Sequence, residues 1–456
     1  MTDASAPAGV VVLGASLAGL LAAAAAEAAG AAVTILERDS LPDAAAPRPG
    51  VPQGRQAHVL LHRGHLAAEA LLPGLTDDVL AAGAVRIDSG LMPWLGEYGW
   101  LPQAPSYEIL SLTRPLLELL VRRRLQTTTR VRLEDGSRAT GLTRDGAQWT
   151  VATEAGERSA DVVIDASGRS SRLPRWLATL GHHVAAPLEV DAQLGYACQV
   201  YRAVRPVPLR HGVMVAASPD LPRSGLALPV EQNRWLIIAA GYGRHRPTRS
   251  AADFVPFLGS LRDPAVRDLV QLLEPEGDLA VYRQTANRRS RYGRGRDWPD
   301  GLLVVGDALC AFDPIYGQGI TVAACQAELL RTGLVEAGRP GGSRRLQRRL
   351  QDIVDLPWSV ATSQDLRQPS CAVRPTVGQR ASIAWSSRLG RLAAGGNATA
   401  VHAFSEVYHL MGSPQLMFAP ALIRDVVRSE ISGYPAPPPR PAELSALAPP
   451  RSVGRR

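Results

Sequence analysis

The stretch Gly306–Gly319 constrains this chain more than any other. It reads GDALCAFDPIYGQG and follows the apolar run Leu302–Val305, which predicts a buried strand. A helical pattern begins directly after it, over Ile320–Leu330. The first turn of a helix has unpaired backbone N–H groups and a partial positive charge. A carboxylate at a strand end (Asp307) and a Gly-rich turn that opens a helix therefore predict a site for a polar cofactor.

A second nucleotide-type signature opens the chain, where Gly14-Ala15-Ser16-Leu17-Ala18-Gly19 joins a strand to a helix. The predicted strand, helix and strand of this βαβ unit are Val10–Leu13, Leu17–Ala29 and Ala32–Leu36. In the GxGxxG fingerprint the first glycine makes the turn, the second admits a pyrophosphate, and the third lets helix and strand pack closely. Ser16 replaces the second glycine, and Glu37 stands where an acid binds ribose hydroxyls. One cofactor that touches both signatures must be long, and flavin adenine dinucleotide (FAD) meets that demand.

Arginines near these signatures are further candidates for cofactor binding. Arg38 and Arg48 flank the entry of the loop Arg48–Gln53, where a guanidinium could pair with a phosphate or stack near an adenine. Alternatively, both arginines are ordinary surface residues that only contribute to solubility. Arg114 begins a predicted helix and is a candidate for a phosphate or ribityl contact. The turn Asp165–Arg172 follows another apolar strand and predicts a further cofactor-facing turn.

Composition narrows the classes of protein to consider. At 456 residues, with 46% hydrophobic and 20% charged residues, we expect a soluble globular protein of two lobes and an appendage. The chain contains no lysine, which excludes a lysine Schiff base or amine acid. The net charge of +8 comes from scattered arginines without a nucleic-acid-binding motif, so no nucleic-acid partner is predicted. The four cysteines form no CxxC pair, so we expect neither a metal site nor a disulfide framework.

The N-terminal apolar stretch could be mistaken for a targeting or membrane segment. Val10–Leu36 contains Glu27 as its one charged residue. It lacks the basic region of a signal peptide, and its glycines are placed for a turn. We therefore expect no stable membrane span and a cytoplasmic location.

The remaining pattern predicts the order of elements. Helices are expected over Gln56–Leu72, Asp77–Ala82 and Thr113–Gln126, after a loop over Asp39–Gly54. A β-meander is expected over Val131–Ile164, and a second sheet from Gln193–Tyr201, His211–Ala217, Gly225–Val230 and Arg234–Gly241. Two short helices are expected over Phe254–Leu273. After Gly341 the pattern is mostly helical with a break at Ala393–Asn397, and the Pro-rich end Pro435–Arg456 is predicted to be disordered.

Several segments together carry a resemblance to a known family. They are Gly14–Gly19 with the apolar residues after it, Glu37-Arg38-Asp39, Arg48–Gln53 leading to His58, Asp165–Arg172, Asn287–Tyr292 and Gly301–Gly319. In this combination the chain resembles the FAD-dependent monooxygenases of the para-hydroxybenzoate hydroxylase fold. Within them it is most similar to the bacterial branch near squalene epoxidase that includes polyether-pathway epoxidases. The resemblance covers about residues 8 to 330 and leaves the C-terminal region unmatched.

The resemblance implies an α/β (mixed α+β) fold. It has a Rossmann-like FAD-binding domain, an inserted substrate domain built on a mostly antiparallel sheet, and a helical C-terminal region. The expected boundaries are 1–84, 106–184 and 283–340 for the discontinuous FAD-binding domain, 85–105 and 185–282 for the substrate domain, 341–434 for the helical region and 435–456 for the tail.

The resemblance also implies roles for individual residues. Gly14, Ser16 and Gly19 would line the pyrophosphate, and Glu37 would bind the ribose. Arg114 would lie along the FAD and Asp307 on the ribityl chain, while Pro314, Gly317 and Gly319 would face the isoalloxazine ring. A helix N-terminus beside that ring would stabilise the anionic reduced flavin. The full expected set of cofactor-binding residues is Gly14, Ser16, Gly19, Glu37, Arg38, Arg48, Gln53, Arg114, Asp165, Asp307, Pro314, Gly317 and Gly319.

The implied reaction transfers one oxygen atom from a C4a-hydroperoxyflavin to a hydrophobic secondary metabolite, such as a polyketide, a terpenoid or an aromatic compound. The electrons would come from NAD(P)H or from reduced flavin supplied by a separate reductase. Alkene epoxidation is preferred because it needs no protein base, only a dry cavity that positions the double bond. Strands of the second sheet, with Trp235, and Leu91–Trp100 are candidates for the cavity wall, although core packing competes for their aromatic residues.

Other functions stay open. Phenol hydroxylation would gain from a base, and the sequence offers no clear one, so no catalytic residue is assigned. A reductase of isoprenoid double bonds has the same fold, and a non-catalytic flavin-binding partner protein is a further alternative. A flavin-dependent halogenase would need a catalytic lysine and a WxWxIP motif, and both are missing from this sequence.

Overall fold

The computed structural model describes residues 7–295 and 297–447. Its first layer is a five-stranded sheet of order β20-β12-β1-β2-β8, in which all neighbouring strands run parallel. The strands are β20 (Leu302–Val304), β12 (Val162–Asp165), β1 (Gly9–Leu13), β2 (Ala32–Leu36) and β8 (Val131–Glu134). The mixed α/β fold expected from the sequence is therefore confirmed.

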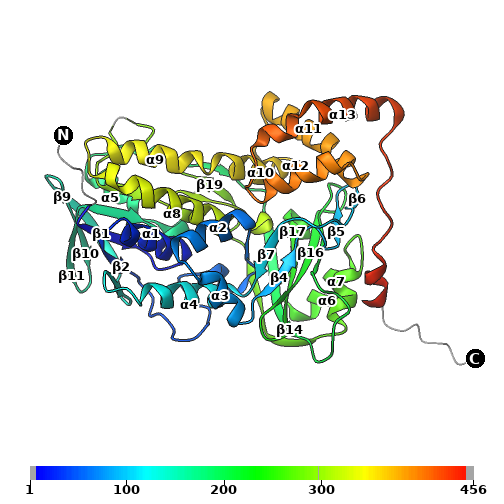
Figure 1. Ribbon diagram of the computed structural model, residues 1–456, viewed down its shortest axis with the longest axis horizontal. Coiled ribbons are helices and arrows are strands. Elements are labelled where there is room, and N and C mark those ends of the chain that lie inside the picture. Colours follow the sequence, from blue (N-terminus) through cyan, green and yellow to red (C-terminus); the bar gives the residue numbers. More distant parts are fainter. Residues whose placement is uncertain (1–6, 296, 448–456) are drawn as a thin grey trace, which may run out of the picture.

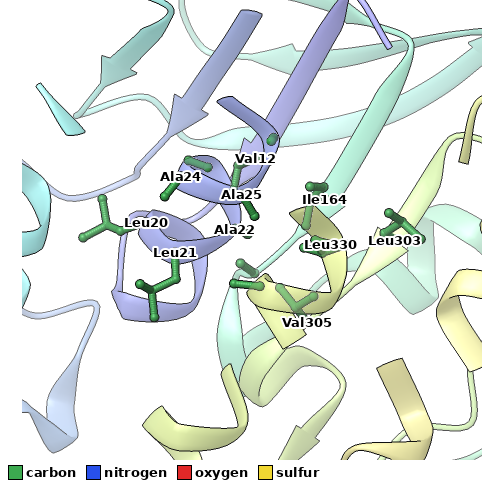
Figure 2. Close-up of a cluster of buried hydrophobic side chains, with 14 of the residues drawn as sticks. Val12, Leu20, Leu21, Ala22, Ala24, Ala25, Ile164, Leu303, Val305 and Leu330 are labelled. Atoms are coloured by element: carbon green, nitrogen blue, oxygen red, sulfur yellow. The ribbon is translucent and has the colours of Figure 1, made fainter. Parts of the chain in front are cut away.

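Two long helices cover this sheet at its centre. Helices α1 (Leu17–Ala28) and α8 (Gln318–Ala337) pack against each other, with buried side chains from both meeting those of the strands (Figure 2). The labelled residues are Val12, Leu20, Leu21, Ala22, Ala24, Ala25, Ile164, Leu303, Val305 and Leu330, and each is at most 2% exposed. The alanine side chains of α1 are small, so the backbone of α8 can pack close to it.

The β-meander expected over Val131–Ile164 is partly wrong. The three strands β9 (Ala139–Asp145), β10 (Gln148–Thr153) and β11 (Gly156–Ala160) form an antiparallel sheet, as expected. The first and last strands of the expected meander are β8 and β12, and these pair in the parallel sheet instead. All four residues of β12 are buried, and the centre of the parallel sheet provides that burial on both faces. Strand β8 is at the edge of the same sheet, where it pairs with β2 and leaves Arg132 exposed.

The second large sheet has seven strands in the order β18-β14-β17-β16-β15-β5-β6. They are β18 (Glu274–Tyr282), β14 (Leu194–Arg202), β17 (Arg234–Tyr242), β16 (Arg223–Val230), β15 (Val213–Val215), β5 (Trp94–Gly96) and β6 (Gly99–Trp100). The four expected strands are present, and so are the two expected short helices, α6 (Phe254–Gly259) and α7 (Ala265–Val270). Both helices lie on one face of this sheet. Strand β18 was not expected, because its first half, Glu-Pro-Glu-Gly-Asp, has neither apolar alternation nor strand propensity.

A small sheet lies between these two. Strands β3 (Val59–Leu60), β7 (Glu108–Ser111) and β4 (Val85–Asp88) form it. The expected helix Gln56–Leu72 is therefore too long at its start: residues 59–60 pair with β7, and α2 spans His62–Leu71. Helix α3 (Leu75–Ala81) begins two residues before the expected position, and α4 (Arg114–Leu125) matches its prediction.

The short strands β13 (Leu188–Val190), β19 (Asn287–Arg289) and β21 (Cys310–Ala311) form another small sheet. Helix α5 spans Leu173–Thr179.

The C-terminal region is helical, as expected, with α9 (Gly342–Asp352), α10 (Asp355–Asp365), α11 (Val377–Ala394), α12 (Ala398–Tyr408) and α13 (Pro420–Ser432). From α13 the chain runs along the second sheet to a 3₁₀ turn, η8 (Ala442–Leu447), beside α7 (Figure 1). Leu444 and Leu447 are fully buried there. Disorder from Pro435 is thus wrong up to Leu447, and residues 448–456 lie outside the described chain. Within the described residues, every helix is too short or too polar to cross a bilayer.

Candidate functional site

A cavity of about 460 Å³ lies where the carboxyl ends of β1, β2 and β12 meet the starts of α1 and α8. This is the edge of an open parallel sheet at which ligands bind, and the volume is that of a cofactor pocket. The cavity brings together the two signatures, which are almost 300 residues apart in sequence. Of the expected cofactor-binding residues, Gly14, Ser16, Glu37, Arg38, Arg48, Gln53, Arg114, Asp307, Pro314, Gly317 and Gly319 line it.

The β1–α1 turn depends on two glycines for different reasons. Gly14 has φ +99°, and a Cβ there would lie 2.8 Å from the carbonyl oxygen of Ala166. Gly19 is in the helix, where a Cβ would lie 1.8 Å from the carbonyl oxygen of Gly14. Gly19 therefore does not line the cavity as expected; it lets α1 pack onto the turn. Ser16 does line it, and its hydroxyl accepts from Arg114 Nη2 at 2.8 Å and donates to Glu118 Oε2 at 3.0 Å.

Glu37 ties the end of β2 to this turn. Its carboxylate accepts from the backbone N–H of Ala15 at 2.8 Å and of Asp39 at 3.0 Å. Arg48 Nη1 lies 3.1 Å from the same carboxylate. Only 5% of Glu37 is exposed, so its remaining acceptor sites face the cavity rather than bulk water.

Arg48 is a buried cation among three carboxylates. Besides Glu37, it contacts Asp39 at 2.9 Å through Nη1 and Glu118 at 2.8 Å through Nε. Burial opposes its charge, but Glu118 and Glu37 outweigh that effect and raise the pKa of the guanidinium. The surface role considered from the sequence is wrong for Arg48, which is 8% exposed. The side chain of Arg38 is 43% exposed, although the residue also lines the cavity. Nη2 of Arg48 is buried and has no partner among the described residues.

Arg114 and His58 form a second buried pair. Arg114 Nη1 lies 2.8 Å from His58 Nε2, and the backbone oxygen of Gln56 lies 2.9 Å from His58 Nδ1. Since a guanidinium can only donate, Nε2 accepts and Nδ1 carries the proton. Burial and the charge of Arg114 lower the pKa of His58 to about 3, so the ring is neutral. Burial also lowers the pKa of Arg114, and its Nε is another buried atom without a partner in the described chain.

The late signature forms the opposite wall. Gly317 has φ +64° and ends the 3₁₀ turn η6 (Pro314–Tyr316), and a Cβ on it would lie 2.3 Å from Val59 Cγ2. Helix α8 begins at Gln318, whose two amide atoms are buried and unpartnered among the described residues. A Cβ on Gly319 would meet no chain atom within 4 Å. Open space and free polar atoms at a helix start fit a planar polar group lying against this turn.

Two carboxylates that the sequence placed in the site behave differently. Asp307 lines the cavity, with its side chain a third exposed and 4.0 Å from Arg169 Nε. Asp165 does not line it: it is fully buried and accepts from the backbone N–H of Ser167 and from the hydroxyls of Ser167 and Ser171. Burial raises the pKa of Asp165, and its contacts make it a brace for the turn after β12.

Sequence reasoning left some functional candidates out. Glu118 lies one turn after Arg114 on α4, and the i, i+4 spacing of the two was the available signal. Arg169 belongs to the quoted turn Asp165–Arg172, and it donates to the backbone oxygens of Ala286 at 2.7 Å and Phe312 at 2.6 Å. Gln318 lies inside the late signature without having been singled out.

Comparison with known proteins agrees with this geometry. No protein-family model matches the chain. Protein Rv3254 of Mycobacterium tuberculosis is 30% identical over 344 residues, which are 71% of this chain and 72% of that protein. Among solved structures, PqsL of Pseudomonas aeruginosa, described as a probable FAD-dependent monooxygenase, has 18% identity and a TM-score of 0.59, covering 79% of this chain and 97% of that one.

The p-nitrophenol 4-monooxygenase PnpA of Pseudomonas putida also has 18% identity, with a TM-score of 0.60 and coverage of 94% of this chain and 98% of its own. At such identities the two structures establish the fold, while the mycobacterial protein establishes kinship. The chain therefore belongs to the family of Protein Rv3254 of Mycobacterium tuberculosis, and its fold is that of the FAD-dependent monooxygenases similar to para-hydroxybenzoate hydroxylase.

Proposed function

We propose that this chain binds FAD and is a flavin-dependent monooxygenase that transfers one oxygen atom to a hydrophobic small molecule. One observation carries the proposal: a single cavity runs from the β1–α1 turn to the start of α8. Buried and unpartnered polar atoms of Arg48, Arg114 and Gln318 border it. Burial of such atoms costs free energy unless a ligand satisfies them, and a dinucleotide carries the phosphates and ring edge that would do so.

Residues that line the cavity would suit each part of FAD. The start of α1 with Ser16 and Arg114 would hold the pyrophosphate, and Glu37 the ribose. Asp307 would bind the ribityl chain. The Pro314–Gly319 turn would face the isoalloxazine ring, where the start of α8 favours negative charge on the reduced ring. Bound FAD, once reduced, supplies the activation of molecular oxygen.

The substrate would lie between that turn and the second sheet, in a substrate domain of residues 85–105 and 185–282. Side chains alternate along β17: Trp235, Ile237 and Ala239 face α6 and α7, while Ile238 and Tyr242 face the opposite way, toward Ile315. Trp235, a candidate for the cavity wall from its sequence, is thus part of the core beneath α6 and α7. The face toward Ile315 is mostly apolar, which favours a hydrophobic substrate.

Two oxygenation reactions remain as finer proposals. Alkene epoxidation needs only positioning and exclusion of water, and the apolar sheet face supports it. Hydroxylation of a phenol or enol gains from a base. A buried pair of carboxyl groups at the same interface favours this second reaction.

The test begins with the purified protein. A flavin absorption spectrum, or uptake of added FAD, is expected. Candidate alkenes and phenols are then supplied with NADPH, FAD, oxygen and a flavin reductase, and the products are weighed by mass spectrometry. Gain of one oxygen atom supports the proposal, whereas gain of two hydrogen atoms in anaerobic turnover points to a reductase of isoprenoid double bonds. A protein that binds no FAD refutes it.

A further inference from the structure

Two carboxyl groups that form no salt bridge with any described residue are buried beside the turn expected to face the flavin. Asp313 lines the cavity and caps η6, accepting from the backbone N–H of Ile315 at 3.0 Å. Asp365 is the last residue of α10, in the C-terminal region that the sequence left without a function. The two are 2% and 1% exposed. No salt bridge of the described residues includes either of them.

Asn287 on β19 connects the two. Its Oδ1 accepts from the backbone N–H of Asp313 at 2.9 Å, and that donor fixes which way the amide points. The amide nitrogen therefore faces both carboxyls, at 3.2 Å from Asp313 Oδ2 and 2.8 Å from Asp365 Oδ2. Since Asn287 is fully buried, one neutral amide holds two acids together away from water.

The groups around the pair do not balance two negative charges. Tyr196 of β14, Tyr242 of β17 and Tyr316 of η6 face it, and burial together with Asp313 and Asp365 raises the pKa of all three phenols. Asp191, before β14, adds another negative charge near Asp365. Arg169 is the cation that acts on Asp313, and Arg367, near Tyr316, is already paired with Glu97 at 2.6 Å. Burial raises the pKa of both carboxyls, and that of Asp365 further, because Asp313 adds to it.

We infer that Asp313 and Asp365 hold one proton between them at neutral pH and form the acid–base group of the site, with Asp313 taking a proton from a substrate hydroxyl. This inference rests on the proposed function and narrows its substrate to a phenol or an enol. Asp313 touches the cavity and is the catalytic residue. Asp365 acts through it and is a positioning residue, since its proton removes the repulsion that a second carboxylate would exert.

The proton transfer balances within the site. The O–H bond of the substrate breaks, its electron pair stays on the substrate oxygen, and a new O–H bond forms on Asp313. Both carboxyls are then neutral, and the single negative charge has moved from Asp313 to the substrate oxygen, so the net charge of the site is unchanged. The proton returns from Asp313 to the oxygen of the product, or to water, as the product leaves. The resulting phenolate or enolate carbon is electron-rich, which is what oxygen transfer requires.

Unused hydrogen-bonding atoms in the same cluster fit an oxygen-bearing substrate. Asp365 Oδ1 and the hydroxyl of Tyr196 are buried without a partner among the described residues. A hydrocarbon would leave both unsatisfied at a cost in free energy, whereas a hydroxyl or carbonyl of the substrate would pair with them.

The test uses 4-nitrophenol as the probe, because its absorbance changes when it ionises. FAD-loaded protein is titrated with it across pH, and difference spectra report the ionised fraction of the bound phenol. Burial and the negative charge of the pair should make the bound phenol of the unchanged protein ionise at higher pH than free 4-nitrophenol, as they do for the three tyrosines. Asp313→Asn should reduce this shift and lower turnover of the phenol about 100-fold or more, because the base is lost. Asp365→Asn should move the pH profile of ionisation and lower turnover less than Asp313→Asn does, whereas a merely structural role would leave that profile in place.

Asp268→Asn is the matched control, since Asp268 is a buried carboxylate on α7 that is paired with Arg267 and lies in another core. It should leave the titration unchanged. Asp313→Asn keeps an oxygen for the N–H of Ile315, so the turn should still fold. An FAD-loaded protein that binds no 4-nitrophenol, or whose titration is the same in Asp313→Asn, overturns the inference alone. Failure to bind FAD overturns the proposed function instead.

Discussion

Arg48 and Arg114 both line the cavity, but they differ in how far neighbouring carboxylates neutralise their charges. Arg48 is neutralised by three carboxylates and keeps one nitrogen free, so its main effect is to hold the loop after β2 in place. Arg114 has no carboxylate within salt-bridge distance in the described chain and contacts Ser16 and the neutral ring of His58. A phosphate would gain more from Arg114, because its charge is less compensated.

Arg114→Gln should therefore weaken FAD binding by about 10- to 100-fold, since a hydrogen bond to a charged group contributes about 1.5–3 kcal/mol. Titration of apoprotein with FAD, followed by flavin fluorescence, measures this. Arg123→Gln, an exposed change on the same helix, serves as the control and should bind FAD as the unchanged protein does. Equal affinities for both variants would contradict the assignment of Arg114.

Asp365 should also make stability depend on pH. Its pKa rises from 3.8 to about 9 on folding, chiefly through burial, so the folded protein holds a proton that the unfolded chain releases. The stabilisation is complete below the unfolded-state pKa and is lost as pH rises through the folded-state value. Between neutral pH and pH 9 the free energy of unfolding should fall in the unchanged protein and fall less in Asp365→Asn. Urea unfolding at several pH values checks this, and parallel slopes would speak against a buried proton.

At the scale of elements, helix α8 borders the cavity with its first turn. Its start needs a left-handed residue at Gly317, and its second residue, Gly319, leaves space that no chain atom fills. Helix α1 has no such free space, because Gly19 packs directly against the turn before the helix. A side chain at Gly19 would therefore clash with the chain, whereas a side chain at Gly319 would extend into open space.

Gly319→Ala should lower FAD affinity about tenfold while the apoprotein keeps or slightly gains stability, since alanine favours a helix by about 1 kcal/mol over glycine. Gly378→Ala on α11 is the matched change, because a Cβ there also meets nothing within 4 Å and the residue lies far from the cavity in sequence and in the fold. Calorimetric FAD binding and thermal unfolding of both variants separate the effects. Unaltered FAD affinity in Gly319→Ala would mean that the cofactor does not approach α8.

For the whole molecule, the C-terminal chain fastens the far side of the second sheet. Leu444 and Leu447 enter the same core as α6 and α7, and Arg440 contacts Asp263 at 2.8 Å. The chain thereby returns from the helical region to the sheet that we expect to border the substrate. The two buried leucines anchor the C-terminal chain through apolar contacts, and the Arg440–Asp263 ion pair lies just before them in the sequence.

Leu444→Ala should lower the free energy of unfolding by about 2–5 kcal/mol, as a buried leucine in a packed core does. Ile431→Ala, on an 84% exposed side chain of α13, should change it by less than about 0.5 kcal/mol. Chemical unfolding followed by tryptophan fluorescence measures both. A neutral Leu444→Ala would show that the tail does not stabilise the sheet.

The sequence by itself determined the half of the molecule that contains the parallel sheet and the cavity. The β1–α1–β2 unit, the late Gly-rich turn and α8 follow from apolar periodicity and from glycines that local backbone geometry requires. Such features depend on neighbours within a few residues, so a pattern can reveal them. The same holds for the strands β14 to β17, whose apolar runs are continuous.

The tertiary structure alone decided which carboxyls are buried together and what the C-terminal region does. Asn287 and Asp365 are 78 residues apart, and nothing in the residues next to either predicts their contact. The pairing of β18 with β14, the places of β8 and β12 in the parallel sheet, and the anchoring of Leu444 also came from contacts with distant elements. Burial depends on the packing of the whole chain. It raises the pKa of Asp313 and Asp365 and so makes the pair a candidate acid–base group.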